Sequence, residues 1–285
     1  MIQRLLPVFP RGLAALALFA LVSLASPLGL SGTARAQGPA ASVLPADVKA
    51  SYKVRFTALG EIGTFNFNSQ VSGKNYTLTA NAKIDTAIFD YRGNMTSVGV
   101  VTPAGIVKTQ PSSHTFEYRQ KALLKKKKLK GLNIAFDRGA VKAVTPPDPL
   151  GPKHVPVTAE QLNNVLDPLS GVMALSMADA AKPCDQKLPI YDGKARFDIQ
   201  FKLLRRSGAD HICSVKLVPV SGHKPGEGAA SVVNGEIELV MRPVPNANVV
   251  IPFSVTVPTV VGTATLISER VDITMPDQKR IALRR

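Results

Sequence analysis

Hydrophobic and polar residues alternate along most of the chain after residue 47, as they do in β-strands that bury one face. In the stretch 52–57, Tyr52, Val54 and Phe56 would point to one side and the polar residues between them to the other. This period of two predicts a strand. Glycine-containing turns at 60–63 and 72–75 lead into two further strands, which predicts a meander of antiparallel hairpins.

The alternation recurs at a spacing of roughly 8–12 residues, which is typical of an all-β sheet that curls or closes. Further strands are predicted at 96–101, 106–109, 115–121, 129–136, 141–144, 188–191, 196–204, 212–220, 236–242, 249–257 and 263–273.

One segment, at about 159–180, has the period of an amphipathic helix instead. Thr158 and Gln161 have the spacing of a capping box at its start. Asp167-Pro168 inside it is either a kink or a fresh start, with Asp as N-cap and Pro at the first helical position. The apolar stripe consists of Leu162, Val165, Leu166, Leu169, Val172, Met173 and Met177. Because a lone helix must bury such a stripe, we predict a mainly β protein. Its strongly curved antiparallel sheet, a half-barrel or β-spiral, would wrap around this helix.

Composition sets the class and size of the protein. Of the 285 residues, 45% are hydrophobic, so the chain can bury a large core and is neither disordered nor fibrous. We expect a flexible leader at 37–47, one domain at 48–275 and a basic tail at 276–285. The 35 basic and 20 acidic residues give a net charge of +15, which leaves nucleic acid, anionic lipid and polyanionic glycan open as partners.

Residues 1–36 have the pattern of a cleavable secretory signal. Arg4 and Arg11 accompany an apolar run at 13–24, and 34–36 fit a small-x-small cleavage site. The run of about 12 apolar residues is shorter than the roughly 20 that cross a bilayer. An uncleaved anchor is therefore the minor alternative, and we expect no transmembrane segment after cleavage. Export also removes the chain from nucleic acid, so we expect no nucleic-acid partner.

Cys184 and Cys213 are the only cysteines. In an oxidising compartment, an isolated pair favours a structural disulfide. A loop of this length would contribute roughly 3–4 kcal/mol to stability. A redox pair and half of a metal site are the alternatives, but the spacing is not Cys-x-x-Cys and no further ligands lie nearby.

The strongest charge cluster surrounds a predicted hairpin tip. It consists of Arg119, Lys121, Lys125, Lys126, Lys127, Lys128 and Lys130. Such a tip attracts lipid phosphate, lipopolysaccharide or another anionic envelope polymer, and the alternative is a solvated tip that keeps the protein soluble. Leu123 and Leu124 beside the run either anchor in a membrane surface or pack inward.

A second hairpin is predicted around the turn Asp192-Gly193. Arg196 and Asp198 follow it, two residues apart and therefore on one strand face. Arg196 either binds an anionic ligand or, as we favour, pairs with a carboxylate and fixes the hairpin. We therefore assign Asp192, Gly193, Arg196 and Asp198 to a structural hairpin.

No catalytic or cofactor motif is found. His114, His154, His211 and His223 do not have the spacing of metal ligands. The chain has no Gly-x-Ser-x-Gly elbow, phosphate loop or dinucleotide fingerprint. The adjacent Ser113 and His114 carry no weight, because triads are assembled in space. We expect no catalytic residues, no metal and no cofactor.

Three motifs in the sequence resemble those of a known protein family. They are Tyr52-x-Val54 with Leu59-Gly60-x-Ile62-Gly63, then Val165-Leu166-Asp167-Pro168-Leu169-Ser170, and then Cys184 followed by Leu188-Pro189-Ile190-Tyr191-Asp192-Gly193-Lys194-Ala195-Arg196-Phe197-Asp198. Together they resemble the bacterial domain of unknown function family 3108, over nearly the whole mature chain. The resemblance implies an exported, periplasmic protein of Gram-negative bacteria. The expected fold is also similar to those of lipoprotein-carrier half-barrels and envelope-integrity β-spiral proteins, in which a curved sheet wraps around a helix. The family supplies no catalytic residues.

We therefore expect a non-enzymatic periplasmic protein that supports the cell envelope by binding envelope proteins or an anionic envelope surface. The first alternative is a carrier of lipid or acylated cargo. Its apolar ligand would enter a concave cavity lined by Phe65, Phe67, Leu162, Leu169 and Met173. An envelope hydrolase is a second and weaker alternative, which a cleft joining a His to a Ser, or two carboxylates, would support.

Overall fold

The computed structural model describes residues 44–102, 108–226, 233–245, 247 and 249–284. The predicted signal at 1–36 and most of the predicted leader lie outside the described residues. Strands dominate the structure, as the alternating pattern predicts. They are β1 Asp47–Phe56, β2 Gly60–Ser72, β3 Asn75–Asp85, β4 Phe89–Thr102, β5 Lys108–Ala122, β6 Lys128–Asp137, β7 Ala140–Thr145, β8 Lys187–Tyr191, β9 Arg196–Ser207, β10 Asp210–Ser221, β11 Ile237–Pro243, β12 Val250–Thr259, β13 Gly262–Thr274 and β14 Arg280–Arg284.

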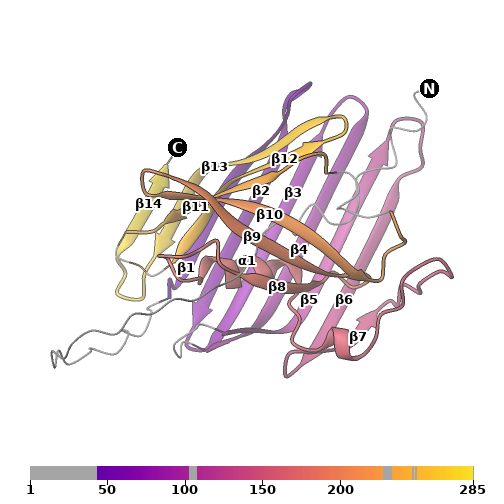
Figure 1. Ribbon diagram of the computed structural model, residues 1–285, viewed down its shortest axis with the longest axis horizontal. Coiled ribbons are helices and arrows are strands. Elements are labelled where there is room, and N and C mark those ends of the chain that lie inside the picture. The colour runs from indigo at the N-terminus through magenta and orange to yellow at the C-terminus, as the bar shows by residue number, and fades with distance from the viewer. Residues whose placement is uncertain (1–43, 103–107, 227–232, 246, 248, 285) are drawn as a thin grey trace, which may run out of the picture.

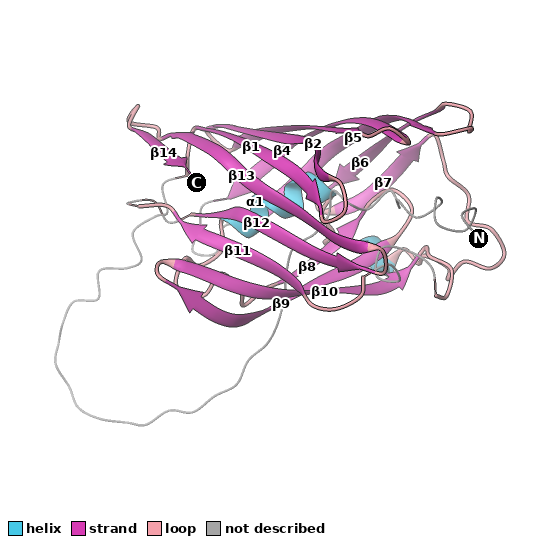
Figure 2. Cartoon of the chain, turned by 90° about the horizontal axis from the view of Figure 1, so that it is seen from above, coloured by secondary structure: helices cyan, strands magenta, loops and turns pink. Residues whose placement is uncertain are grey.

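These strands form one antiparallel sheet in which most neighbours along the chain are neighbours in space. The order is β7-β6-β5-β4-β3-β2-β1-β13-β12-β11-β10-β9-β8, and β14 pairs with β13. The sheet bends over, so that its two halves face each other across the α-helix α1, Pro168–Ser176 (Figure 1, Figure 2). This confirms the prediction of a mainly β fold whose curved antiparallel sheet wraps around one helix.

The edge strands β7 and β8 do not pair with each other, so the sheet is not closed. The chain leading into α1 lies between them. Asn163 forms an isolated bridge with Ala140 of β7, and Leu166 forms one with Ile190 of β8. This segment therefore covers part of both sheet edges, whose backbone groups would otherwise be open to pairing with another chain.

The helical region is shorter than the predicted helix at 159–180. Residues Glu160–Leu162 form one turn of 3-10 helix, and α1 begins only at Pro168. A residue that precedes proline is disfavoured in the α-conformation, and Asp167 is accordingly extended, with φ −73° and ψ 165°. The predicted extent of the helix, 159–180, is therefore too long. Of the two interpretations of Asp167-Pro168, the fresh start is confirmed.

The predicted strands at 106–109 and 115–121 belong to a single strand, β5, as far as the described residues extend. Pro111 lies within it, where the register between β4 and β5 shifts beside Val98 and Gly99. Proline is found inside sheets at such irregularities because it has no amide proton to donate. The strand therefore continues through the proline, with a shift in register.

A disulfide links one edge of the sheet to an interior strand. Cys184 and Cys213 form the predicted disulfide, with their Cα atoms 5.5 Å apart, and link the loop before β8 to β10.

The segment 276–285, predicted as a basic tail, contains β14, which pairs with β13. Ile281 and Leu283 of β14 contact a buried cluster, so this part of the segment is integrated into the sheet.

The helix α1 joins the two halves of the sheet through the core. Leu169 and Met173 are buried with Tyr76 and Leu78 of β3, whereas Leu175 is buried in a cluster that includes the disulfide and strands β8 to β12. A helix that is apolar on several sides is expected to be enclosed. Its N-terminus is thereby held against β3, β4 and β5.

Candidate functional sites

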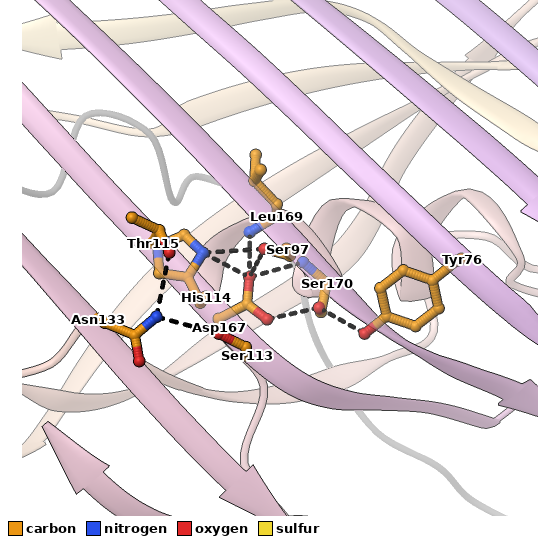
Figure 3. Close-up of polar contacts among 9 residues, drawn as sticks. All are labelled: Tyr76, Ser97, Ser113, His114, Thr115, Asn133, Asp167, Leu169 and Ser170. Atoms are coloured by element: carbon orange, nitrogen blue, oxygen red, sulfur yellow. Dashed lines mark hydrogen bonds and ion pairs between the residues drawn. The ribbon is translucent and has the colours of Figure 1, made fainter.

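A buried polar cluster lies where the N-terminus of α1 meets β3, β4 and β5 (Figure 3). Asp167, the N-cap of α1, accepts hydrogen bonds at Oδ1 from the backbone amides of Leu169 and Ser170, both at 3.0 Å. These bonds satisfy amides that the first helical turn leaves without an intrahelical partner. Asp167 is fully buried, so its charge must be balanced within the protein.

Strands β4 and β5 supply part of that balance. Ser97 and His114 are directly paired across these strands, and both are buried. The Ser97 hydroxyl donates to Asp167 Oδ1 at 2.6 Å, and His114 Nδ1 lies 2.8 Å from Ser97 Oγ and 3.1 Å from Asp167 Oδ1. Because Ser97 gives its only hydroxyl proton to Asp167, the network assigns a proton to Nδ1 of His114.

A second chain of hydrogen bonds reaches the carboxylate from β3. The Ser170 hydroxyl donates to Asp167 Oδ2 at 2.5 Å, and the Tyr76 hydroxyl, 2.8 Å from Ser170 Oγ, donates to that oxygen. Gly99 of β4 leaves room for this phenol, since a Cβ atom at that position would lie 2.5 Å from the Tyr76 hydroxyl. Both carboxylate oxygens are therefore hydrogen-bonded, and we call Tyr76, Ser97, His114, Asp167 and Ser170 the helix clamp.

The electrostatics of the helix clamp favour an ionised carboxylate. Burial by itself raises the pKa of Asp167, but the electrostatic influence of His114 and the hydrogen bonds from His114, Ser170 and Ser97 outweigh it. The pKa therefore lies below its ordinary value of 3.8. Burial, reinforced by the Asp167 charge and opposed by the hydrogen bond to Ser170, raises the pKa of Tyr76. At neutral pH the clamp holds an anionic Asp167 and a neutral phenol.

The helix clamp contains the residue types of a hydrolase triad without its arrangement. In such a triad, one ring nitrogen faces the serine and the other faces the carboxylate. Here Ser97 and Asp167 share Nδ1 of His114, which already carries a proton and so cannot accept the serine proton. Ser97 and Asp167 have no exposed surface and His114 has 2%. What the arrangement can do is anchor the start of α1 to three strands.

Sequence reasoning identified the cap residue of this cluster but missed its partners. It considered His114 as a metal ligand and as a neighbour of Ser113, whose hydroxyl instead accepts a hydrogen bond from Asn133 (Figure 3). A signal was present: Ser97 and His114 occupy inward positions between apolar neighbours such as Met95. Buried polar side chains within a sheet need a partner, but the alternation does not say which one.

The predicted basic cluster lies at the tip of the β5–β6 hairpin and on the adjoining strand ends. Within the described part of the chain, Lys121, Lys125–Lys128 and Lys130 have no acidic side chain within 4.0 Å. Arg119 differs, because it lies 3.5 Å from Asp90. Leu123 and Leu124 are 53% and 99% exposed, so the interpretation that they pack inward is wrong. We call residues 121–130 the basic tip.

The Asp192 hairpin is held mainly by its own residues. Oδ1 of Asp192 accepts hydrogen bonds from the amides of Lys194 and Ala195, at 3.0 and 2.7 Å, and Gly193 has φ +94°. Arg196 and Asp198 lie 2.7 Å apart. In addition, Arg196 Nε donates to the Gln161 carbonyl and Lys187 lies 2.9 Å from Asp198. The guanidinium therefore ties β9 to the chain that leads into α1.

The space between α1 and the sheet is small. The crevice that α1 forms with β1, β2 and β12 has a volume of about 40 Å³, far below the roughly 300 Å³ of small-ligand pockets. Of the residues predicted to line a cavity, Phe67 and Met173 border this crevice, whereas Leu169 is fully buried in the core and Leu162 packs in a separate cluster. A carrier function would require α1 to leave the concave face.

Among the residues that the structure describes, no group of three or more His, Cys, Asp and Glu side chains is placed to hold a metal ion. None of the helices in the described ranges has the length and apolar composition needed to span a bilayer.

The fold and the helix clamp define a disulfide-containing protein whose strongly curved, unclosed antiparallel sheet surrounds a short capped helix. The chain matches the family described as "Protein of unknown function (DUF3108)" over residues 51–265, and it belongs to that family. This confirms the resemblance. No curated protein matches the chain.

Among solved structures, the chain is similar to a beta-barrel-like protein of domain of unknown function DUF1849 from Brucella abortus. The identity is 10% and the TM-score is 0.43, over 81% of this chain and 99% of that chain. At this identity and score, the likeness says nothing about function.

Proposed function

We propose that this protein is an exported, non-enzymatic binding protein of the periplasm, which supports the cell envelope by holding an anionic envelope component at its basic tip. The observation that carries the proposal is the contrast in charge pairing at the β3–β4 and β5–β6 hairpins. Beside the β3–β4 turn, Asp90 of β4 lies 3.1 Å from Arg92 of the same strand and 3.5 Å from Arg119 of β5, so these charges are paired. The lysines of the basic tip have no such partner among the described side chains.

Unpaired charge of one sign on a hairpin tip is suited to binding the opposite charge. Clustered lysines attract anionic surfaces over about one Debye length, roughly 8–10 Å at ordinary ionic strength. The predicted signal at 1–36 and the disulfide between Cys184 and Cys213 support an oxidising location outside the cytoplasm. The enclosed helix clamp, in which His114 is not arranged as a base for Ser97, supports binding over catalysis.

The test is binding of the purified mature protein to vesicles that contain phosphatidylglycerol and to dextran sulfate, a soluble polyanion, at several salt concentrations. We expect binding to both, weakening as salt rises. Replacing Lys125, Lys126, Lys127 and Lys128 with Gln should weaken vesicle binding by about 4 kcal/mol, at about 1 kcal/mol for each lysine. The free energy of unfolding should change by less than about 0.5 kcal/mol.

A matched control removes the same charge elsewhere. Lys74, Lys142, Lys182 and Lys202 are exposed and lie outside the basic tip, so their replacement with Gln lowers the net charge equally. This control should keep most of the affinity. Equal losses in the two variants would mean that overall charge, and not the tip, governs binding. Absence of binding to both polyanions would refute the proposed function.

A further inference from the structure

Exposed aliphatic side chains gather at one end of the sheet. Among the described residues, nine large hydrophobic side chains are exposed, and seven of them lie in or beside four hairpin turns. The seven are Leu59, Ile88, Leu123, Leu124, Leu129, Val260 and Val261. The other two, Val98 and Leu203, lie within strands β4 and β9.

The topology places these four turns at the same end. The β1–β2, β3–β4 and β5–β6 turns share an end because consecutive antiparallel strands reverse direction. The β12–β13 turn joins them because Phe56, at the end of β1, pairs with Ala264, near the start of β13. Figure 1 shows these four turns towards the upper right. We call this end, with its seven aliphatic residues, the aliphatic end.

Neighbouring turns at the aliphatic end are joined by hydrogen bonds. The Leu123 amide donates to the Ile88 carbonyl at 2.8 Å, which links the β5–β6 and β3–β4 turns. The Thr57 amide donates to the Thr263 carbonyl at 3.0 Å, which links the β1–β2 and β12–β13 turns. The exposed side chains are therefore held on two connected pairs of turns.

The opposite end has a different composition. Three of its hairpin turns, at 72–75, 137–140 and 207–210, contain Ser, Gly, Lys, Asn, Asp, Arg and Ala, the small and polar residues typical of turns. The connections that follow β11 and β13 at this end also contain apolar residues, but Val244, Val249 and Met275 are buried. The requirements of turn formation therefore do not explain the aliphatic residues at the other end.

Leu124 shows this most clearly. Its side chain is 99% exposed and its backbone has φ +59°, in the left-handed region that favours Gly and Asn. A leucine at this position gains little from burial within the protein and is disfavoured by its backbone conformation. The adjoining lysines of the basic tip place positive charge beside it.

We propose that the aliphatic end docks on an anionic lipid bilayer, with Leu124 and its neighbours inserted at the boundary between headgroups and acyl chains and the lysines of the basic tip on lipid phosphates. This rests on the proposed function and names its partner. A soluble polyanion would neutralise the lysines but leave the aliphatic side chains in water, whereas a bilayer accommodates both. An interfacial segment of this kind reaches roughly 5–10 Å into the boundary region.

The absence of tryptophan from the chain allows a direct test. Leu124→Trp introduces a single reporter at the aliphatic end, and Leu203→Trp introduces one at an exposed position on β9 as a matched control. With phosphatidylglycerol vesicles, we expect the emission of Leu124→Trp to shift to shorter wavelength and to be quenched by lipids brominated on their acyl chains. The emission of Leu203→Trp should do neither.

A second variant measures the contribution of insertion to affinity. Replacing Leu123, Leu124 and Leu129 with Ser removes apolar side chains that are already exposed, so the fold should be retained. Binding to phosphatidylglycerol vesicles should weaken by at least about tenfold, while binding to dextran sulfate should not change.

The possible failures are distinguishable. Lysine-dependent binding to vesicles and dextran sulfate, with unquenched Leu124→Trp and no effect of the serine variant, would overturn insertion and leave the proposed function standing. A dimer in sedimentation velocity that the serine variant disperses would overturn insertion in favour of a contact between two copies of the chain. Absence of binding to both polyanions would remove both proposals.

Discussion

The helix clamp and the basic tip are both rich in polar side chains, but they differ in how those side chains are satisfied. In the clamp, both oxygens of Asp167 accept hydrogen bonds, and Ser97, with no exposed surface, contacts two partners. At the tip, six lysines have no acidic side chain within 4.0 Å among the described residues, and Leu124 is almost wholly exposed.

This difference distinguishes two explanations for a residue type that is unusual at its position: a role in the fold and a role in binding. A buried polar group that is fully hydrogen-bonded is explained by the fold, because leaving it unpaired would cost roughly 1–3 kcal/mol or more. An exposed leucine at positive φ beside unpaired lysines is not explained by the fold. The clamp residues look catalytic by type and are structural by geometry, whereas the tip residues look like ordinary surface and carry our functional proposal.

The largest effect is expected in the clamp. Asp167→Ala removes the cap of α1 and leaves His114 and two hydroxyl groups without their acceptor, so the free energy of unfolding should fall by about 3 kcal/mol. Asp185→Ala, at an exposed position, should change it by less than about 0.5 kcal/mol. Chemical denaturation checks both values, and similar midpoints for the two variants would contradict the assigned role of the clamp.

Acid should also weaken the fold through His211, a buried group outside the clamp. Burial, reinforced by Arg206 and opposed by Asp210, lowers the pKa of His211 from its ordinary value of 6.5. The stability that depends on neutral His211 is therefore present above about pH 6.5 and is lost as pH falls below it. Each unit of separation between the folded and unfolded pKa contributes about 1.4 kcal/mol.

Asp167 responds only at lower pH. Its pKa is lowered below 3.8, so its contribution is present above that value and is lost as pH falls through the folded pKa. Between about pH 7 and pH 5, protonation of His211 should lower the free energy of unfolding, and His211→Leu should remove that contribution. Denaturation midpoints at several pH values test this, and an equal loss in His211→Leu would contradict it.

The smallest effect is expected at the tip and has the opposite sign. Leu124→Asn places a residue that tolerates positive φ at an exposed turn, so the free energy of unfolding should rise by about 0.5 kcal/mol. The same change should weaken vesicle binding. A lower free energy of unfolding in Leu124→Asn would show that the fold needs Leu124, as it needs the clamp residues, and would contradict the distinction between the two regions.

The strands were predictable because each depends on a local pattern. Alternation indicated β1 from Tyr52, Val54 and Phe56, and the isolated pair Cys184 and Cys213 indicated the disulfide. β14 was missed because the run Arg280–Arg284, although it alternates, is short and strongly basic. It is part of the sheet because β13 extends far enough to pair with it.

The extent of the helix was less predictable. Val165 and Leu166 have helical spacing with Leu169, yet both are buried in extended chain. Leu166 bridges to β8, and Pro168 disfavours helix before it. The burial of Val165 and Leu166 was therefore predicted correctly, but their secondary structure was not. Apolar spacing shows that side chains are buried, but it does not show whether they pack from a helix or from an extended segment at the edge of the sheet.

The sequence by itself determined the β class, the disulfide, the cap at Asp167 and the charge of the basic tip. The strands, the cap and the charge follow from residues that are neighbours in the chain, and the disulfide follows because the chain has only two cysteines. Only the tertiary structure decided that Ser97 and His114 balance Asp167, and that Leu59, Leu124 and Val260 share one end of the sheet. These relations join residues far apart in sequence, and they exist only because strand register and the curvature of the sheet bring those residues together.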